Sequence, residues 1–256
     1  MCPTVNAHFW RTVLVLQMLV GGRSVKSSLK VMGNVKAKRI TVLLAEDHTV
    51  VRQGLRLILN TAEDIQVVGE AENGRQAVTL VKNLKPDVAL LDIAMPLLNG
   101  LEAARQLRQD APNTRVLILS SYDDDRFIEQ SVEGGATGYL LKQSAANDLI
   151  KAIQEVNKGR TFYSPAIQKR LNSRVPGRNG QHKTLDKLSR REAEVLQLIA
   201  EGFANKQIAD ELKISVKTVE KHRQSMMNKL NIHEVAGLTR YAYARGLVGT
   251  PAPPVQ

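Results

Sequence analysis

Cysteine and aromatic residues are scarce in this sequence, and its histidines follow no recognisable pattern. The single cysteine, Cys2, excludes a disulfide framework and a cysteine-based zinc site, and it favours a reducing compartment. The five histidines show no metal-ligand spacing. Aromatic residues make up only 4% of the chain, which argues against stacking platforms for single-stranded nucleic acid.

Long hydrophobic runs are missing as well. The apolar stretch at residues 13–20 is interrupted by Gln17 and is much shorter than the roughly 20 residues that a membrane-spanning helix needs. It also has neither the basic start nor the small-residue cleavage site of a secretory signal. We interpret residues 1–37 as a non-structural extension, with Met32 as an alternative start that mass spectrometry of the native N-terminus would test.

The remaining composition is that of a globular protein. The chain has 256 residues, of which 43% are hydrophobic and 24% charged, and this excludes collagen-like, disordered and polytopic membrane classes. The length fits one large domain or two small ones. Residues 38–165 carry 15 basic and 17 acidic side chains, whereas residues 166–256 carry 16 basic and 8 acidic ones. The basic C-terminal part favours a nucleic-acid partner, with a solvated basic surface as the alternative.

Short apolar runs alternate with segments of helical spacing through residues 38–160. The runs are Ile40–Ala45, Ile65–Val68, Val88–Leu91, Val116–Leu119 and Tyr139–Leu141. Three of them contain continuous apolar residues, which is typical of strands buried on both faces of a parallel sheet. The alternation predicts a doubly wound, flavodoxin-like α/β domain with a parallel five-stranded sheet in the order 2-1-3-4-5.

Polar side chains follow four of these predicted strands. Glu46 and Asp47 follow the first strand, Asp92 the third, Ser120 the fourth and Lys142 the fifth. Taken singly, each has a simple structural interpretation as a cap, a turn residue, a partner of backbone groups or a solvated lysine. Because ligands bind at the carboxyl ends of such strands, their joint occurrence predicts a functional site there.

Four motifs at these positions resemble the receiver domain of two-component response regulators. They are Ala45-Glu46-Asp47-His48, Leu91-Asp92-Ile93-Ala94-Met95-Pro96, Leu119-Ser120-Ser121 and Gly138-Tyr139-Leu140-Leu141-Lys142. The resemblance covers about residues 38–160. It implies that Asp92 accepts a phosphoryl group from a cognate histidine kinase.

The same resemblance implies the supporting roles. Mg²⁺ would be held by Glu46, Asp47, Asp92 and the backbone carbonyl of Ala94, although the family often has Asp where this chain has Glu46. Ser120 and Lys142 would bind phosphoryl oxygens, and Tyr139 would occupy an aromatic switch position. A divalent cation with oxygen ligands suits this chemistry, because a carboxylate that attacks a phosphoryl group brings two anions together.

Two rival interpretations apply to this domain. A phosphohydrolase of the haloacid-dehalogenase type also uses an aspartate at a strand end, but it requires a second aspartate two residues later, where this chain has Ala94. A DNA-binding regulator that works without phosphorylation would not need the complete set of strand-end residues. We therefore expect a regulator and not an enzyme.

The sequence of the C-terminal part predicts a linker, a small helical domain and a tail. Residues 161–183 are rich in basic residues and contain Pro176, Gly177 and Gly180, which favours a linker, and residues 250–256 form a tail. Within residues 184–249, Ser189 and Glu192 form a predicted capping box at the start of a helix. Further helices are expected at Asn205–Leu212, from Ser215 to Leu230, and at Glu234–Arg245.

A short helix, a tight turn and a longer polar-faced helix indicate a helix-turn-helix, with a generic helical bundle as the alternative. Three segments make the pattern resemble the LuxR-type helix-turn-helix: Leu188-Ser189-Arg190-Arg191-Glu192, Asn205-Lys206-Gln207-Ile208-Ala209 and Thr218-Val219-Glu220-Lys221-His222. Together the two domains resemble response regulators of the NarL/FixJ type.

That resemblance assigns the DNA contacts and the function. It places Glu220, Lys221 and Gln224 at base edges in the major groove of double-stranded DNA. It places Lys206, Ser215, Lys217 and Thr218 near phosphates, and gives His222 a packing or phosphate role. The implied protein is a cytoplasmic, sequence-specific transcription factor that becomes a homodimer when phosphorylated.

Overall fold

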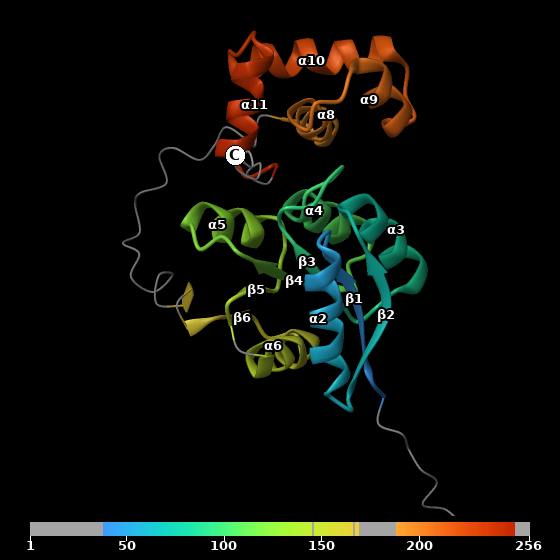
Figure 1. Cartoon of the computed structure of the whole chain (residues 1–256), viewed down its shortest axis with the longest axis vertical. Coiled ribbons are helices and arrows are strands. Elements are labelled where there is room, and N and C mark those ends of the chain that lie inside the picture. The colour runs from blue at the N-terminus through green and yellow to red at the C-terminus, as the bar shows by residue number, and fades with distance from the viewer. Residues whose placement is uncertain (1–37, 145, 166, 169–187, 249–256) are drawn as a thin grey trace, which may run out of the picture. The chain divides into compact units, whose positions relative to one another are not determined.

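The computed structural model describes residues 38–144, 146–165, 167–168 and 188–248 (Figure 1). The predicted extension, most of the predicted linker and the predicted tail lie outside these residues. Residues 39–256 belong to one unit that contains both the sheet and the C-terminal helices.

A parallel sheet forms the first domain, as the sequence predicts. Its strands are β1 (Ile40–Ala45), β2 (Ile65–Ala71), β3 (Val88–Asp92), β4 (Arg115–Ser120), β5 (Gly138–Leu141) and β6 (Phe162–Tyr163). The strand order is β2-β1-β3-β4-β5-β6, so the predicted five-strand order is confirmed and one strand is added at the edge. The added strand has two residues, pairs in parallel with β5, and falls within the segment predicted as linker.

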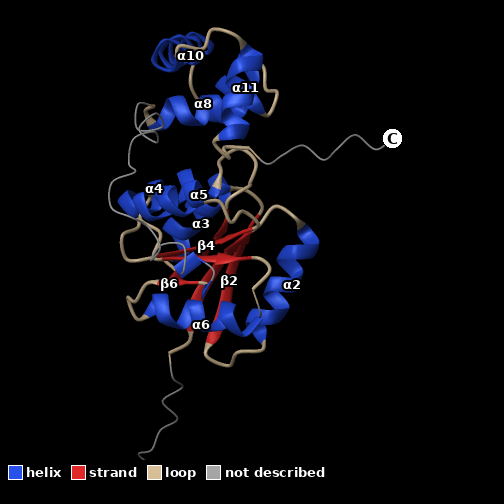
Figure 2. Ribbon diagram, turned by 90° about the vertical axis from the view of Figure 1, so that its left-hand side faces the viewer, coloured by secondary structure: helices blue, strands red, loops and turns tan. Residues whose placement is uncertain are grey.

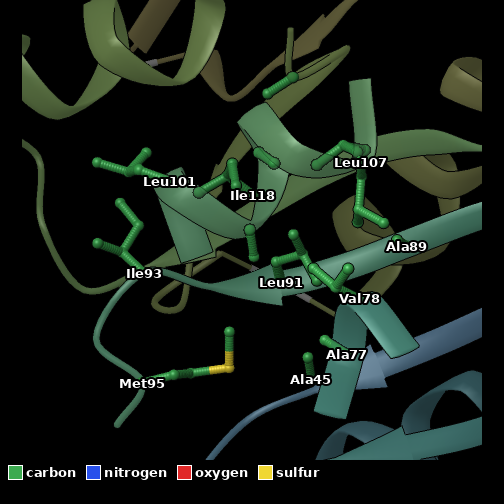
Figure 3. Packing of buried hydrophobic residues seen from close by; sticks show 14 of the residues in the cluster. Ala45, Ala77, Val78, Ala89, Leu91, Ile93, Met95, Leu101, Leu107 and Ile118 are labelled. Carbon is green, nitrogen blue, oxygen red and sulfur yellow. The ribbon is translucent and has the colours of Figure 1, made fainter. Parts of the chain in front are cut away.

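Helices cover both faces of the sheet (Figure 2). They are α2 (Thr49–Asn60), α3 (Gly74–Leu84), α4 (Gly100–Asp110), α5 (Asp125–Glu133) and α6 (Ala146–Asn157). Side chains alternate across each strand, so Leu91 and Ile118 pack with α3, α4 and α5, whereas Leu90 and Leu117 pack with α2 and α6. Figure 3 shows Leu91, Ile118, Leu101 and Leu107 in the first of these two clusters.

The segment between β3 and α4, residues 93–99, is tightly folded against the end of the sheet. An added Cβ at Gly100 would lie only 1.9 Å from the carbonyl oxygen of Asp92, so a side chain has no room at that position. The side chain of Asn99 caps α4 by accepting a hydrogen bond from the Glu102 backbone N–H at 2.9 Å. We call residues 93–99 the β3–α4 loop.

Four helices form the second domain: α8 (Arg190–Ala200), α9 (Asn205–Leu212), α10 (Val216–Leu230) and α11 (Val235–Ala244). Their positions agree with the sequence prediction to within a residue or two. Val195, Val219, Met226 and Leu238 lie in one buried cluster that joins α8, α10 and α11. Lys213 adopts a left-handed conformation with φ 55° and forms the sharp turn between α9 and α10.

Glu192 ties α8 to α10. The predicted capping box is present: Ser189 caps α8, and Glu192 accepts the Ser189 backbone N–H at 2.7 Å. The same carboxylate accepts from the Ser225 hydroxyl at 2.6 Å and from the Lys229 ammonium at 2.7 Å. Burial alone would raise the pKa of Glu192, but these bonds from Lys229, Ser225 and Ser189 outweigh it and lower the pKa to about 2.

Glu192→Gln is expected to lower the free energy of unfolding of this domain by about 1–2 kcal/mol at neutral pH, because it removes a charged hydrogen-bond acceptor. The folded-state pKa lies below the ordinary value of 4.5, so the stabilisation is complete above pH 4.5 and is lost as the pH falls towards 2. Thermal unfolding midpoints measured across this range should converge for the two proteins at acidic pH. Glu234→Gln, at an exposed position without a side-chain capping bond, is the control. A difference in unfolding midpoint between Glu192→Gln and the wild type that does not change with pH would contradict this account.

Candidate phosphorylation site and nucleic-acid interface

Residues from the ends of three strands meet at the carboxyl edge of the sheet. The Lys142 ammonium lies 2.7 Å from the Glu46 Oε2 and 3.0 Å from the Asp92 Oδ2. Glu46 follows β1, Asp92 ends β3 and Lys142 follows β5. The parallel topology therefore brings together residues that are 46 and 50 positions apart in the sequence.

Asp92 is the buried carboxylate of this cluster. It is only 4% exposed, and its Oδ1 accepts the backbone N–H of Ile93 at 2.8 Å. Burial raises the pKa of Asp92 to about 6, against the opposing effect of the Lys142 ammonium. The carboxylates of Asp92 and Glu46 outweigh burial and raise the pKa of Lys142. Lys142 therefore carries a positive charge beside the carboxylate oxygens.

A second group of possible metal ligands lies next to this cluster. One oxygen each from Glu46 and Asp47 and one ring nitrogen of His48 all lie within 4.8 Å of one another. His48 was not singled out by the sequence reasoning, and its Nδ1 lies 2.8 Å from Asp47 Oδ1. Asp47 is the main cause of the raised pKa of His48. The two carboxylates are the hard oxygen ligands that Mg²⁺ prefers.

Ser120 and Tyr139 meet at the end of β4. Ser120 is fully buried, and its hydroxyl accepts the Tyr122 backbone N–H at 3.0 Å. The Tyr139 hydroxyl donates to the Tyr122 carbonyl at 2.6 Å. Burial raises the pKa of Tyr139, so its hydroxyl keeps its proton. Tyr122, which the sequence reasoning missed, thus links the two predicted switch residues through its backbone.

The polar surface of α10 is open. Six of the seven predicted DNA-contacting residues line one shallow hollow, together with two residues that were not predicted, Ser225 and Asn228. The six are Ser215, Lys217, Thr218, Glu220, Lys221 and Gln224. Lys206, on α9, is exposed but does not line the hollow.

Several polar residues on α10 also have structural partners. Ser215 caps the helix by accepting the Thr218 backbone N–H at 3.1 Å. Gln224 donates to Asn228 at 3.0 Å, so Asn228 holds the amide of Gln224 on the exposed face. Because Val219 and Met226 are fully buried on the opposite side, the polar stripe necessarily faces outwards. His222 is half-buried.

Comparisons with known proteins match a family to the sheet domain and another to the C-terminal helical domain. Residues 42–154 match the family model described as the response regulator receiver domain, and residues 186–242 match the one described as bacterial regulatory proteins of the luxR family. The oxygen regulatory protein NreC of Staphylococcus carnosus is 38% identical over 213 residues, which cover 81% of this chain and 98% of the relative. The chain belongs to the response regulators. It combines a receiver domain with a LuxR-type DNA-binding domain, as in the NarL/FixJ type.

Other relatives agree with this assignment. The regulator is 33% identical to the response regulator protein VraR of Staphylococcus aureus over 209 residues, which cover 82% of this chain and 99% of the relative. A solved structure of two RcsB dimers bound to two DNAs resembles the regulator with a TM-score of 0.51 at 28% identity, covering 81% and 99% of the two chains. A LuxR-family response regulator from Aurantimonas sp. SI85-9A1 gives a TM-score of 0.51 at 31% identity, covering 53% and 96%.

Over the part of the chain that the structure describes, no helix of the regulator combines the length and the apolar character needed to cross a bilayer.

Proposed function

We propose that Asp92 is the phosphoryl acceptor of this regulator and that its phosphorylation controls binding of double-stranded DNA through α10. The observation that carries this proposal is the Lys142 ammonium held between the carboxylates of Asp92 and Glu46. An ammonium in this position can bind a phosphoryl oxygen as readily as a carboxylate.

The transfer itself needs one nucleophile and several stabilising charges. An oxygen of Asp92 attacks the phosphorus of the donor and forms an acyl phosphate. The bond from phosphorus to the kinase histidine breaks, and its electron pair stays with the imidazole. Lys142 neutralises charge on the transferred group, and Ser120 donates its hydroxyl proton to another phosphoryl oxygen.

Mg²⁺ is the proposed cofactor. Glu46, Asp47 and Asp92, with the carbonyl of Ala94, would hold it, and it would neutralise charge between the attacking carboxylate and the phosphoryl group. The gathering of Glu46 and Asp47 oxygens with a His48 nitrogen supports an acidic cation site at this edge. His48 is an additional candidate ligand that this grouping brings forward.

The proposed partners follow from the two domains. A cognate histidine kinase supplies the phosphoryl group, and the phosphorylated chain forms a homodimer that binds an operator. Glu220, Lys221 and Gln224 are proposed to contact base edges, whereas Lys206, Ser215, Lys217 and Thr218 contact phosphates. The proposed site of action is the cytoplasm, where bacterial DNA lies, and the proposed role is regulation and not enzymatic turnover. The receiver predicted at 38–160 is extended in this proposal to include β6 (Phe162–Tyr163), and the proposed DNA-binding domain spans 184–249.

Removal of the metal is expected to slow phosphorylation strongly. Treatment of the full chain with acetyl phosphate and Mg²⁺ should give a phosphorylated band on Phos-tag electrophoresis. Excess EDTA should reduce the initial rate at which this band forms at least about tenfold, because the charge between the Asp92 carboxylate and the phosphoryl group is no longer neutralised. Asp47→Asn should reproduce much of this loss. Asp210→Asn, an exposed change on α9, should not. Phosphorylation that is unaffected by EDTA would contradict the proposed cofactor.

A further inference from the structure

The β3–α4 loop, which begins directly after Asp92, is bound at two points by one glutamine of the DNA-binding domain. Oε1 of Gln197 accepts both the backbone N–H of Asn99, at 2.9 Å, and its side-chain amide, at 3.0 Å. Nε2 of Gln197 donates to the Met95 carbonyl at 3.0 Å. Gln197 is 1% exposed. One amide of α8 therefore binds both ends of a five-residue segment and contacts the residue that caps α4.

Glu201 binds the middle of the same loop. Its carboxylate accepts the Leu97 backbone N–H at 3.1 and 3.2 Å and the Gln197 side-chain amide at 2.8 Å. Leu97 has φ 65°, in the left-handed region that residues with a Cβ avoid, and its side chain packs against the core of the DNA-binding domain. A strained conformation persists only where its surroundings hold it, and here those surroundings belong to the other domain.

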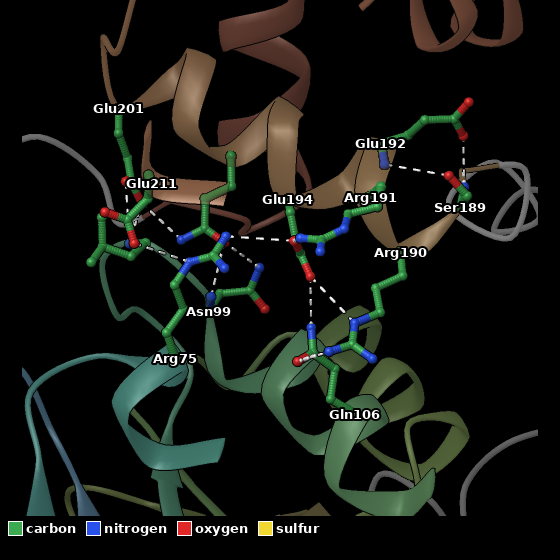
Figure 4. A network of polar contacts seen from close by, with 12 residues as sticks. Arg75, Asn99, Gln106, Ser189, Arg190, Arg191, Glu192, Glu194, Glu201 and Glu211 are labelled. Carbon is green, nitrogen blue, oxygen red and sulfur yellow. Dashed lines mark hydrogen bonds and ion pairs between the residues drawn. The ribbon is translucent and has the colours of Figure 1, made fainter. Parts of the chain in front are cut away.

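Further contacts join the two domains around this loop. Figure 4 shows Glu194 of α8 facing Gln106 of α4, which donates to it at 3.0 Å, and Arg75, whose guanidinium lies 3.5 Å from it. Glu194 is buried, and Arg191 also pairs with it at 2.7 Å. Its charge is thus balanced within the interface.

A second attachment reaches the segment that follows Ser120. Arg126 donates to the carbonyl of Ala244 at 3.1 Å. An added Cβ at Gly246 would lie 1.9 Å from the Phe127 ring, so the chain after α11 lies directly against this ring. The Phe127 and Tyr122 ring centroids are 4.6 Å apart. The β3–α4 loop and the segment that follows Ser120 are therefore both in contact with the DNA-binding domain.

These contacts leave the DNA-binding surface uncovered. Every residue that lines the hollow on α10 comes from α10 itself or from its cap, Ser215. The interface consequently does not act by covering these residues. What it holds instead is the receiver loop beside the phosphoryl acceptor.

We propose that Gln197 is a positioning residue through which the docked DNA-binding domain restrains the β3–α4 loop and slows phosphoryl transfer to Asp92. The inference rests on the proposed function of Asp92. A carboxylate that is 4% exposed reaches a phosphodonor only when a neighbouring segment moves, and two of these segments are held by the other domain. Contacts that exist only while the DNA-binding domain is docked on the receiver stabilise this docked arrangement relative to one in which the two domains are apart.

The test compares initial rates of phosphorylation by acetyl phosphate with Mg²⁺ in the full chain. Gln197→Ala removes all three bonds to the loop, whereas Gln197→Glu keeps an acceptor for Asn99 and loses the donor to Met95. Both variants should be phosphorylated faster than the wild type, with a gain of about five- to tenfold for Gln197→Ala. Gln154→Ala, on α6 at the opposite face of the sheet, is the matched control and should behave as the wild type.

Two further measurements separate this role from loss of folding. Hydrogen–deuterium exchange in residues 95–99 should become faster in Gln197→Ala, because the Asn99 N–H loses its acceptor and the Met95 carbonyl loses its donor. Binding to random DNA at low salt should be unchanged if the second domain stays folded. Equal or slower phosphorylation of folded Gln197 variants overturns this inference alone. Absence of phosphorylation in every chain, the wild type included, would instead overturn the proposed function of Asp92.

Discussion

Asp92→Asn is expected to abolish incorporation of acid-labile phosphate from acetyl phosphate and Mg²⁺. The amide keeps the shape of the side chain but removes the nucleophilic carboxylate, and the remaining carboxylates of the cluster serve other roles. In the structure Glu46 already pairs with Lys142 at 2.7 Å, and Asp47 lies beside His48. Radiolabelled donor and mass spectrometry of the intact chain would measure the loss, which should exceed about a hundredfold.

Asp64→Asn is the matched control for this experiment. Asp64 is an exposed carboxylate of the same domain that accepts a hydrogen bond from Gln154, and it directly precedes β2, at the opposite end of this strand from the proposed site. It should be labelled at the wild-type rate. Undiminished labelling of Asp92→Asn would contradict the assignment of the acceptor.

Lys221→Ala and Gln224→Ala are each expected to weaken binding to the operator by about 1–3 kcal/mol and to change binding to scrambled DNA little. Both side chains are exposed on the polar stripe of α10, where lysine can donate to guanine and glutamine can pair with adenine. Gln224 also donates to Asn228, which fixes its amide on that stripe. Binding titrations on operator and scrambled duplexes would measure the difference.

Lys217→Ala is the comparison variant in this series. Lys217 is exposed near the start of α10, where we expect a phosphate contact. Its loss should weaken binding to both duplexes similarly. It should also reduce the slope of the logarithm of affinity against the logarithm of salt concentration by about one. If Lys217→Ala alone changed base preference, or if the other two variants bound the operator normally, the proposed orientation of α10 in the groove would be wrong.

Local patterns were sufficient to predict most of the fold. Continuous apolar runs such as Val88–Leu91 predicted buried parallel strands, and the structure confirms them within β3. The capping box of Ser189 and Glu192 located the start of α8, because capping depends on residues three positions apart. The convergence of Glu46, Asp92 and Lys142 could be predicted because parallel strands place their carboxyl ends at one edge.

Features that depend on distant side chains were not predictable in this way. The two-residue strand β6 carries too short a pattern to be recognised, and it exists because it pairs with β5. Gln197 lies within α8 and gives no sign in the sequence of its bonds to Met95 and Asn99, which are about a hundred residues away. The left-handed conformation of Leu97 has the same origin, since its N–H bonds to Glu201.

The most direct test of the central claim is a binding titration of the full chain on an operator duplex, selected from random DNA by the chain itself, before and after treatment with acetyl phosphate and Mg²⁺. The wild type should bind at least about tenfold more tightly after treatment, because phosphorylation favours the DNA-binding dimer. Asp92→Asn should bind equally before and after. Equal affinity of the wild type under both conditions, or tighter binding of treated Asp92→Asn, would contradict the claim that phosphorylation of Asp92 controls DNA binding.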